Sequence, residues 1–151
     1  MKDEQTLVLI KPDAMANGLA GNILSELDYL SLKLIAMKMV KVPKELAETH
    51  YGVHKEKPFF NELVKHLTGE LHNNEAVIAL VYQGESAIEK IRKIAGATNP
   101  DEADFKTLRR KYGCVNSLTG CYETVIHASD STENAEKEIK LWFKEEDIIN
   151  N

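Results

Sequence analysis

The sequence is poor in cysteine, and it lacks a long hydrophobic run and an excess of positive charge. Its two cysteines, Cys114 and Cys121, are too few for a disulfide framework and form no CxxC pair. We therefore expect both thiols to be reduced, with little role in metal binding. The formal net charge of −5 disfavours a general nucleic-acid or membrane-surface binder, because such proteins need a basic field.

No apolar run approaches the length that crosses a membrane, and the acidic start of the chain predicts no secretory signal. The predicted location is the cytoplasm. The glycine-rich loops that hold phosphate in many proteins are absent too, since there is neither a Walker A sequence nor a GxGxxG. Any bound phosphate must therefore be held by side chains.

The hydrophobic pattern predicts one domain, residues 1–151, of the α+β class. Continuous apolar runs at 6–10 and 76–81 predict two central strands, and 33–42 and 125–127 predict two more. Helices are expected at about 19–30, 43–52, 58–67, 86–95 and 131–142. This order is the ferredoxin-like βαββαβ pattern: an antiparallel sheet with helices on one face, an added helical hairpin and a long loop before the last strand. A partner subunit is expected to cover the other face.

The expected long loop, 96–122, is rich in hydrogen-bond donors and cations, including Thr98, Arg109 and Arg110. A loop of this length inside a compact domain is typical of a functional or interface segment, although a solvated surface loop explains it equally well. Aromatic residues make up 7% of the chain, and the expected central strands are aliphatic. An RNA-binding module of similar topology is therefore disfavoured, because it would carry aromatic side chains on its sheet.

The stretch Val125-Ile126-His127-Ala128-Ser129-Asp130-Ser131 reads as strand, histidine, turn and helix start. Asp130 or Ser131 can cap the helix, whose first N–H groups and dipole favour an anion nearby. A histidine that merely ends a strand is the plainer interpretation of this stretch alone. The balance changes if Lys11, Arg92 and Arg109 converge on His127, because three cations and an imidazole suit a polyphosphate and a nucleophile.

Glu138, two turns into the last helix, is the candidate to orient the His127 ring, although a solvated glutamate is the commoner fate on a helix. The remaining histidines are weaker candidates. His50 and His54 lack the glutamate of an HExxH motif, and we expect them to be ordinary residues. His66 and His72 are expected on the surface.

Motif by motif, the chain resembles the nucleoside diphosphate kinases from Thr6 to about Glu146. The matching segments are Thr6 to Ala14, His50-Tyr51 with Lys57 to Phe60, Arg92 to Pro100, Thr107 to Arg109, Val125 to Ser131 and Leu141 to Lys144. The first segment and the histidine segment are specific by themselves. The resemblance implies transfer of the γ-phosphate of a nucleoside triphosphate to a nucleoside diphosphate, for example from ATP to GDP, by a ping-pong mechanism.

The resemblance also implies a role for each matching residue. His127 would be phosphorylated on Nδ1, with Ser129 and Glu138 as its supports and Lys11 as a further catalytic residue. The residues that would hold the phosphates and the sugar are Lys11, Tyr51, Arg92, Thr98 and Arg109. Phe59 would stack on the base beside Leu63, which accepts every base. Mg²⁺ would be carried by the nucleotide phosphates, with no protein side chain as its ligand.

Several positions depart from the family pattern. Thr124 stands where the family has an asparagine that contacts the sugar, Glu123 replaces an arginine, and the segment from Gly113 to His127 is longer than usual. The family builds hexamers or tetramers from a common dimer, and we expect a homo-hexamer, with a homo-tetramer as the alternative. A catalytically weak or silent relative, acting as a nucleotide-binding or scaffold module, is the competing hypothesis. No membrane or specific nucleic-acid partner is predicted.

Overall fold

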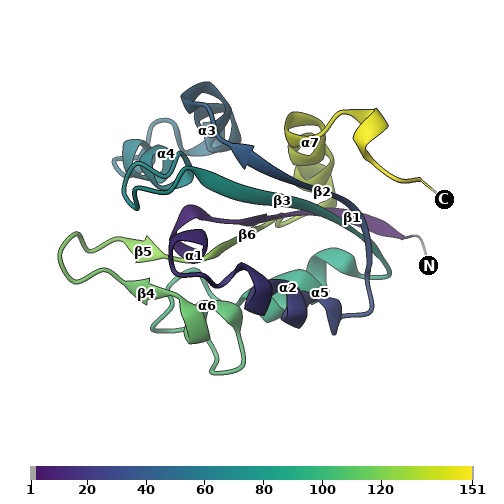
Figure 1. Cartoon of the computed structure of the whole chain (residues 1–151), viewed down its shortest axis with the longest axis horizontal. Coiled ribbons are helices and arrows are strands. Elements are labelled where there is room, and N and C mark those ends of the chain that lie inside the picture. Colours follow the sequence, from purple (N-terminus) through teal and green to yellow (C-terminus); the bar gives the residue numbers. More distant parts are fainter. Residues whose placement is uncertain (1–2, 151) are drawn as a thin grey trace.

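The computed structural model describes residues 3–150, and its centre is a four-stranded antiparallel sheet (Figure 1). The strands are β1 (Glu4–Ile10), β2 (Lys33–Lys41), β3 (Ala76–Gly84) and β6 (Ile126–Ala128), in the order β2-β3-β1-β6. The first and third strands along the chain are therefore central, as their unbroken apolar runs predict. Leu9 of β1 lies opposite His127 of β6, so the short last strand takes its register from the core.

Helices cover both faces of the sheet, which corrects one detail of the predicted fold. Alternate β1 residues point to opposite sides, so that Leu7 packs on one face and Val8 on the other. The first face carries α3 (Lys44–His50), α4 (Phe60–Leu67) and α7 (Thr132–Trp142). The second carries α1 (Pro12–Ala16), α2 (Ala20–Asp28), α5 (Ala87–Ala95) and α6 (Leu108–Tyr112) (Figure 1). The cover is not complete, because Met37 and Met39 of the outer strand β2 remain 53% and 67% exposed.

The ferredoxin-like fold and the helical hairpin α3–α4 are confirmed, and two short helices were missed. Pro12 begins α1, where the sequence suggests only a loop, because proline suits the first helical turn. The expected loop 96–122 contains α6 and leads into a two-stranded hairpin of β4 (Cys114–Val115) and β5 (Tyr122–Glu123). Two short 3-10 helices lie at Gly52–His54 and Glu145–Asp147. Within residues 3–150, no helix has both the length and the apolar character needed to cross a membrane.

Candidate active site

A cavity of about 950 Å³ lies beside β6 and collects residues from distant parts of the chain. Ten of the eleven predicted site residues line it: Lys11, Tyr51, Phe59, Leu63, Arg92, Thr98, Arg109, Thr124, His127 and Glu138. The eleventh, Ser129, is buried behind the strand, where its hydroxyl accepts a hydrogen bond from the backbone N–H of Leu7 at 3.2 Å. Ser129 therefore joins the turn after β6 to the backbone of β1 and does not itself line the cavity.

A strained turn directly before His127 positions this residue at the cavity. The buried Val125 has φ = 55°, a left-handed conformation that is unusual for a β-branched residue, and the N–H of Ile126 donates back to the carbonyl of Thr124 at 2.6 Å. Two contacts hold this turn: the N–H of Val125 donates to Asp13 Oδ2, and its carbonyl accepts from the N–H of Lys11, both at 2.9 Å. Such strain persists only where the surroundings fix it, and it is common at functional sites.

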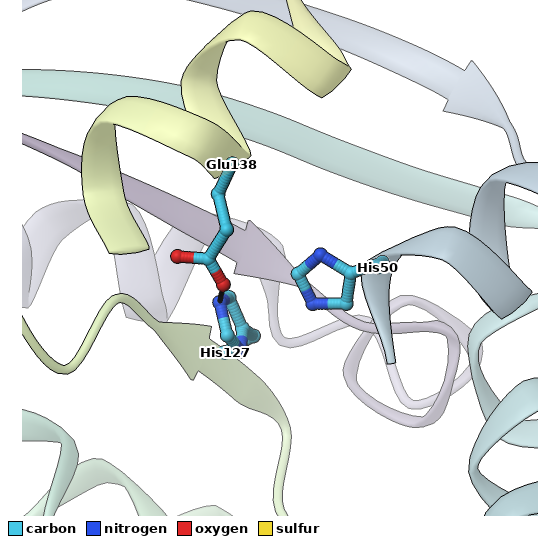
Figure 2. Close-up of side chains that lie close together, drawn as sticks. All are labelled: His50, His127 and Glu138. Carbon is cyan, nitrogen blue, oxygen red and sulfur yellow. Dashed lines mark ion pairs between the residues drawn. The ribbon is translucent and has the colours of Figure 1, made fainter. Parts of the chain in front are cut away.

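Glu138 contacts the nucleophile candidate directly. Its Oε1 lies 2.7 Å from Nε2 of His127, and both side chains are mostly buried (Figure 2). The contact has the distance but not the geometry of a standard hydrogen bond. Because a carboxylate only accepts, it favours the ring form that carries a proton on Nε2. Nδ1 of His127 then keeps a free lone pair.

Sequence reasoning missed the contact of His50 with this pair. The His50 ring lies 4.4 Å from that of His127, centroid to centroid and at 80°, and its Nδ1 accepts a hydrogen bond from Nε1 of Trp142 at 3.1 Å. Burial, together with the nearby His127 and Lys11, lowers the pKa of His50 to about 2, so the ring is neutral. The adjacent Tyr51 matched the family, but nothing in the sequence paired His50 with Trp142.

Among the predicted site residues, three cations line the cavity without a carboxylate partner in the described part of the chain: Lys11, Arg92 and Arg109. Burial lowers the pKa of Lys11, whose Nζ donates to Oγ1 of Thr124 at 2.9 Å. Burial, followed by repulsion from Arg92, lowers the pKa of Arg109 to about 10. The burial of Lys11 and Arg109 and the repulsion between Arg109 and Arg92 favour an anion in the cavity, and a polyphosphate has the charge and the oxygen atoms suited to them.

Backbone carbonyls and burial fix the geometry of this cationic group. The guanidinium of Arg109 donates to the carbonyl of Gly96 at 2.8 Å and to that of Ile126 at 3.0 Å. Burial, aided by Asp13, raises the pKa of Tyr51, which therefore keeps its hydroxyl proton as a hydrogen-bond donor. Thr98 and Arg92 are exposed at the edge of the cavity.

The donor atoms of His50, His127 and Glu138 lie within 4.8 Å of one another, a spacing that a metal ion could use (Figure 2). The hydrogen bond to His50 argues against that use. A metal-bound histidine carries a proton on its other nitrogen and donates it, whereas Nδ1 of His50 already accepts from Trp142. The cluster is better described as the His127 ring held between His50 and Glu138.

The other end of the cavity is formed by α4 and the β4–β5 hairpin. Phe59 is 44% exposed, and Leu63 and His54 line the cavity with it, the His54 ring lying 5.7 Å from that of Phe59. The thiol of Cys121 donates to Glu62, which also lines the cavity. This end therefore contributes exposed aromatic surface to the cavity, whereas Lys11, Arg92 and Arg109 line the end near His127.

Further side-chain contacts lie next to the β4–β5 hairpin at this end of the cavity. Nε2 of His72 is 3.2 Å from Oε1 of Glu123 and 3.3 Å from Nδ1 of His66, and the thiol of Cys114 donates to Glu123 at 2.9 Å. The prediction that His66 lies on the surface was wrong, because it is only 4% exposed. These contacts join the hairpin to the loop after α4.

A ferredoxin-like sheet with an imidazole between unpaired cations defines a phosphate-binding protein with a candidate nucleophile. The family model for nucleoside diphosphate kinase matches residues 4–148. A nucleoside diphosphate kinase of Clostridium perfringens is 49% identical over 143 residues, which are 95% of this chain and 93% of the relative. The chain belongs to the nucleoside diphosphate kinase family, and the resemblance inferred from its motifs is confirmed.

Two solved structures of relatives extend the match to three dimensions. A halophilic nucleoside diphosphate kinase from Halobacterium salinarum, in complex with CDP, has a TM-score of 0.88 at 34% identity, covering 99% of this chain and 93% of its own. A transition-state mimic of the Borrelia burgdorferi enzyme, with bound vanadate and ADP, has a TM-score of 0.88 at 32% identity, covering 99% and 92%.

Proposed function

We propose that this chain is a nucleoside diphosphate kinase that transfers phosphate through Nδ1 of His127. The observation that carries the proposal is the placement of His127 among Lys11, Arg92 and Arg109, none of them paired with a carboxylate within residues 3–150. A silent scaffold has no physical need to keep the buried Lys11 and the partly buried Arg109 unpaired, because their desolvation costs free energy. The relatives captured with CDP and with ADP and vanadate support a nucleotide as the ligand.

The proposed reaction has two half-steps. The Nδ1 lone pair of His127 attacks the γ-phosphorus of a triphosphate, the bond from that phosphorus to the β–γ bridging oxygen breaks, and the diphosphate leaves with that electron pair. The proton on Nε2 stays in place, and Glu138 stabilises the positive charge that develops on the ring. A terminal oxygen of a second diphosphate then attacks the phosphorus, the P–N bond breaks, and free His127 returns.

The nucleotide is proposed to lie with its phosphates at His127 and its base at Phe59. Lys11 and Arg109 hold the phosphates from inside the cavity, while Arg92, Thr98 and Tyr51 contact them or the sugar from its edge. Thr124, bonded to Lys11, lies next to the sugar. Stacking on the exposed Phe59 beside Leu63 requires no particular base edge, and this supports broad base tolerance.

Phosphotransferases of this family generally use a divalent metal, and we propose Mg²⁺ carried by the nucleotide. The donor set of the site fits that arrangement, since the carboxylates that line the cavity are already engaged: Glu138 with His127, Glu62 with Cys121 and Asp130 with Asn134. When bound, Mg²⁺ neutralises phosphate charge during the transfer.

The chain is further proposed to act as one domain, 1–151, in a homo-hexamer, with a homo-tetramer as the alternative. The edge strand β2 supports self-association, because its outer backbone edge is unpaired in the described sheet and its Met37 and Met39 side chains are 53% and 67% exposed. The free thiols of Cys114 and Cys121 support a cytoplasmic location. The molar mass of the assembly in solution separates hexamer from tetramer.

Labelling with γ-³²P-ATP tests the proposed function. The wild-type protein should become phosphorylated, the label should survive base but not acid, and added GDP should discharge it as GTP. His127→Ala should remain unlabelled, while His54→Ala, which changes a histidine beside Phe59 and not at the nucleophile, should be labelled. An unlabelled wild-type protein, or label retained in His127→Ala, contradicts the proposal, and the first of these results favours the scaffold alternative.

A further inference from the structure

His50 takes no part in the transfer steps proposed above, yet it packs directly on the nucleophile. Its ring meets that of His127 at 80° with 4.4 Å between centroids, and Figure 2 shows it extending from α3 toward the His127–Glu138 pair. It also contacts the rings of Tyr51 and Trp142, at 4.8 and 5.6 Å. A side chain wedged between these neighbours has little freedom to turn.

The hydrogen bond from Trp142 fixes the chemical form of His50. An indole N–H can only donate, so Nδ1 of His50 must accept, and the single proton of the neutral ring is on Nε2. The low pKa of His50 means that it stays neutral over the whole working range of pH. It therefore packs against His127 without adding a positive charge that would oppose the charge developing there.

We propose that His50, anchored by Trp142, is a positioning residue that keeps Nε2 of His127 on Glu138 and Nδ1 toward the phosphate. The inference rests on the proposed function. The terminal torsion of a histidine is soft and roughly two-fold, so one contact with Glu138 does not by itself fix the ring plane. Rotation of the His127 ring would drive its atoms into His50 at the observed separation, so the two neighbours together leave one orientation.

Three variants separate positioning from simple packing. His50→Ala removes the ring that limits rotation of His127. The rate of His127 phosphorylation by ATP should then fall on the order of 100-fold, the scale expected when a reacting group is misplaced by about an ångström. His50→Phe restores a ring and should recover most of that loss. Trp142→Phe frees Nδ1 of His50 and should give an intermediate rate. The apparent KM for ATP should change little in all three, because His50 holds the nucleophile and not the nucleotide.

Nitrogen-15 NMR of the imidazoles gives a readout that a structural role alone would not move. In the wild type, His127 and His50 should each show a single form with the proton on Nε2, and His50 should not titrate between pH 8 and pH 4. In His50→Ala, the His127 signals should average between the two neutral forms. His54→Ala, which alters the other histidine of this segment, should leave these signals unchanged.

A folded His50→Ala protein that is phosphorylated at the wild-type rate, or whose His127 keeps one ring form, overturns the inference. Circular dichroism establishes that the variant is folded, and His50→Phe carries the NMR test if it is not: loss of the single His127 form despite the retained ring would contradict a steric wall. Failure of the proposed function looks different, because the wild-type protein itself would then remain unlabelled.

Discussion

The two ends of the cavity are held in place by different means. At the phosphate end, formed by Lys11, Arg92, Arg109, His127 and Glu138, the anchors are mainly backbone groups of the core: Lys11 and His127 follow or lie within paired strands, and Arg109 donates to two carbonyls. At the hairpin end, formed by α4 and the β4–β5 hairpin, the anchors are mainly side-chain contacts such as His72 with Glu123.

Under the proposed function, this difference separates the groups that perform the chemistry from those that bind the base. Groups that make and break bonds must keep their positions to a fraction of an ångström, and strands of a buried sheet provide that rigidity. Contacts made by side chains on loops adjust more easily, which suits a surface that must accept different bases. Substitutions at the phosphate end should therefore change the rate of transfer, while those at the hairpin end should change affinity.

Lys11→Met should give the largest effect of the substitutions considered in this comparison. Lys11 is 4% exposed, and methionine fills similar space without the charge. We expect kcat/KM to fall on the order of 100- to 1,000-fold, the cost of removing one preorganised charge from a reaction centre. Because the charge is buried and its pKa is lowered by desolvation, its loss should leave Tm unchanged or raise it.

Steady-state kinetics and thermal unfolding of the same preparation check both expectations for Lys11→Met, the lower kcat/KM and the unchanged or raised Tm. Glu123→Gln is the matched variant at the hairpin end and should cost less than about tenfold in kcat/KM, as expected for one charged contact. A parallel loss of Tm and activity in Lys11→Met would show that the lysine mainly holds the fold together.

The phosphate end was largely predictable from the sequence because its residues follow elements with clear patterns. The apolar run before Lys11 and the strand-to-helix change after His127 place both residues at strand ends, and Ser131 does cap α7 by accepting from the N–H of Asn134 at 3.1 Å. The order of the elements also gave the central strands. Coverage of both sheet faces was missed, because periodicity shows that a helix has an apolar side but not which face of the sheet it meets.

The remaining features depend on contacts between distant segments. Nothing near His50 signals that Trp142, 92 residues later, will donate to it, and nothing near His66 predicts its burial against His72. The left-handed backbone of Val125 contradicts its own preference, so local rules cannot find it. Such features are fixed by tertiary structure alone.

The loss of folding stability at low pH should differ between the two ends, because each has a histidine, His50 or His66, whose pKa is lowered by burial. Folding lowers the pKa of His50 to about 2 and lowers that of His66, in both cases chiefly by burial. The unfolded chain then binds more protons than the folded one below about pH 6.5, so stability present at neutral pH is lost as the pH falls toward the folded pKa. The slope contributed by one histidine is at most about 1.4 kcal/mol per pH unit.

Chemical denaturation at pH 7, 6, 5 and 4 measures this slope. His50→Phe should flatten the curve over the whole interval, whereas His66→Phe should flatten it less, because the shift of His50 is the large one. An acid dependence that is identical in wild type and His50→Phe would mean that His50 is protonated in the folded state, and it would remove the neutral partner on which the positioning of His127 depends.

His72→Ala should give the smallest effect and is the sharpest test of the division between the two ends. The substitution removes the contact between His72 and Glu123, whose side chains are 13% and 17% exposed, respectively. The hairpin should then be held less firmly. A single hydrogen-bonding contact of this kind is worth about 1 kcal/mol, so the KM for the acceptor diphosphate should rise about fivefold. The rate of His127 phosphorylation at saturating ATP should not change. Lys65→Ala, which removes the exposed pair with Glu70 nearby, should change neither quantity. If His72→Ala slows phosphorylation as much as it weakens acceptor binding, the hairpin contributes to the chemistry and the two ends of the cavity are one functional unit.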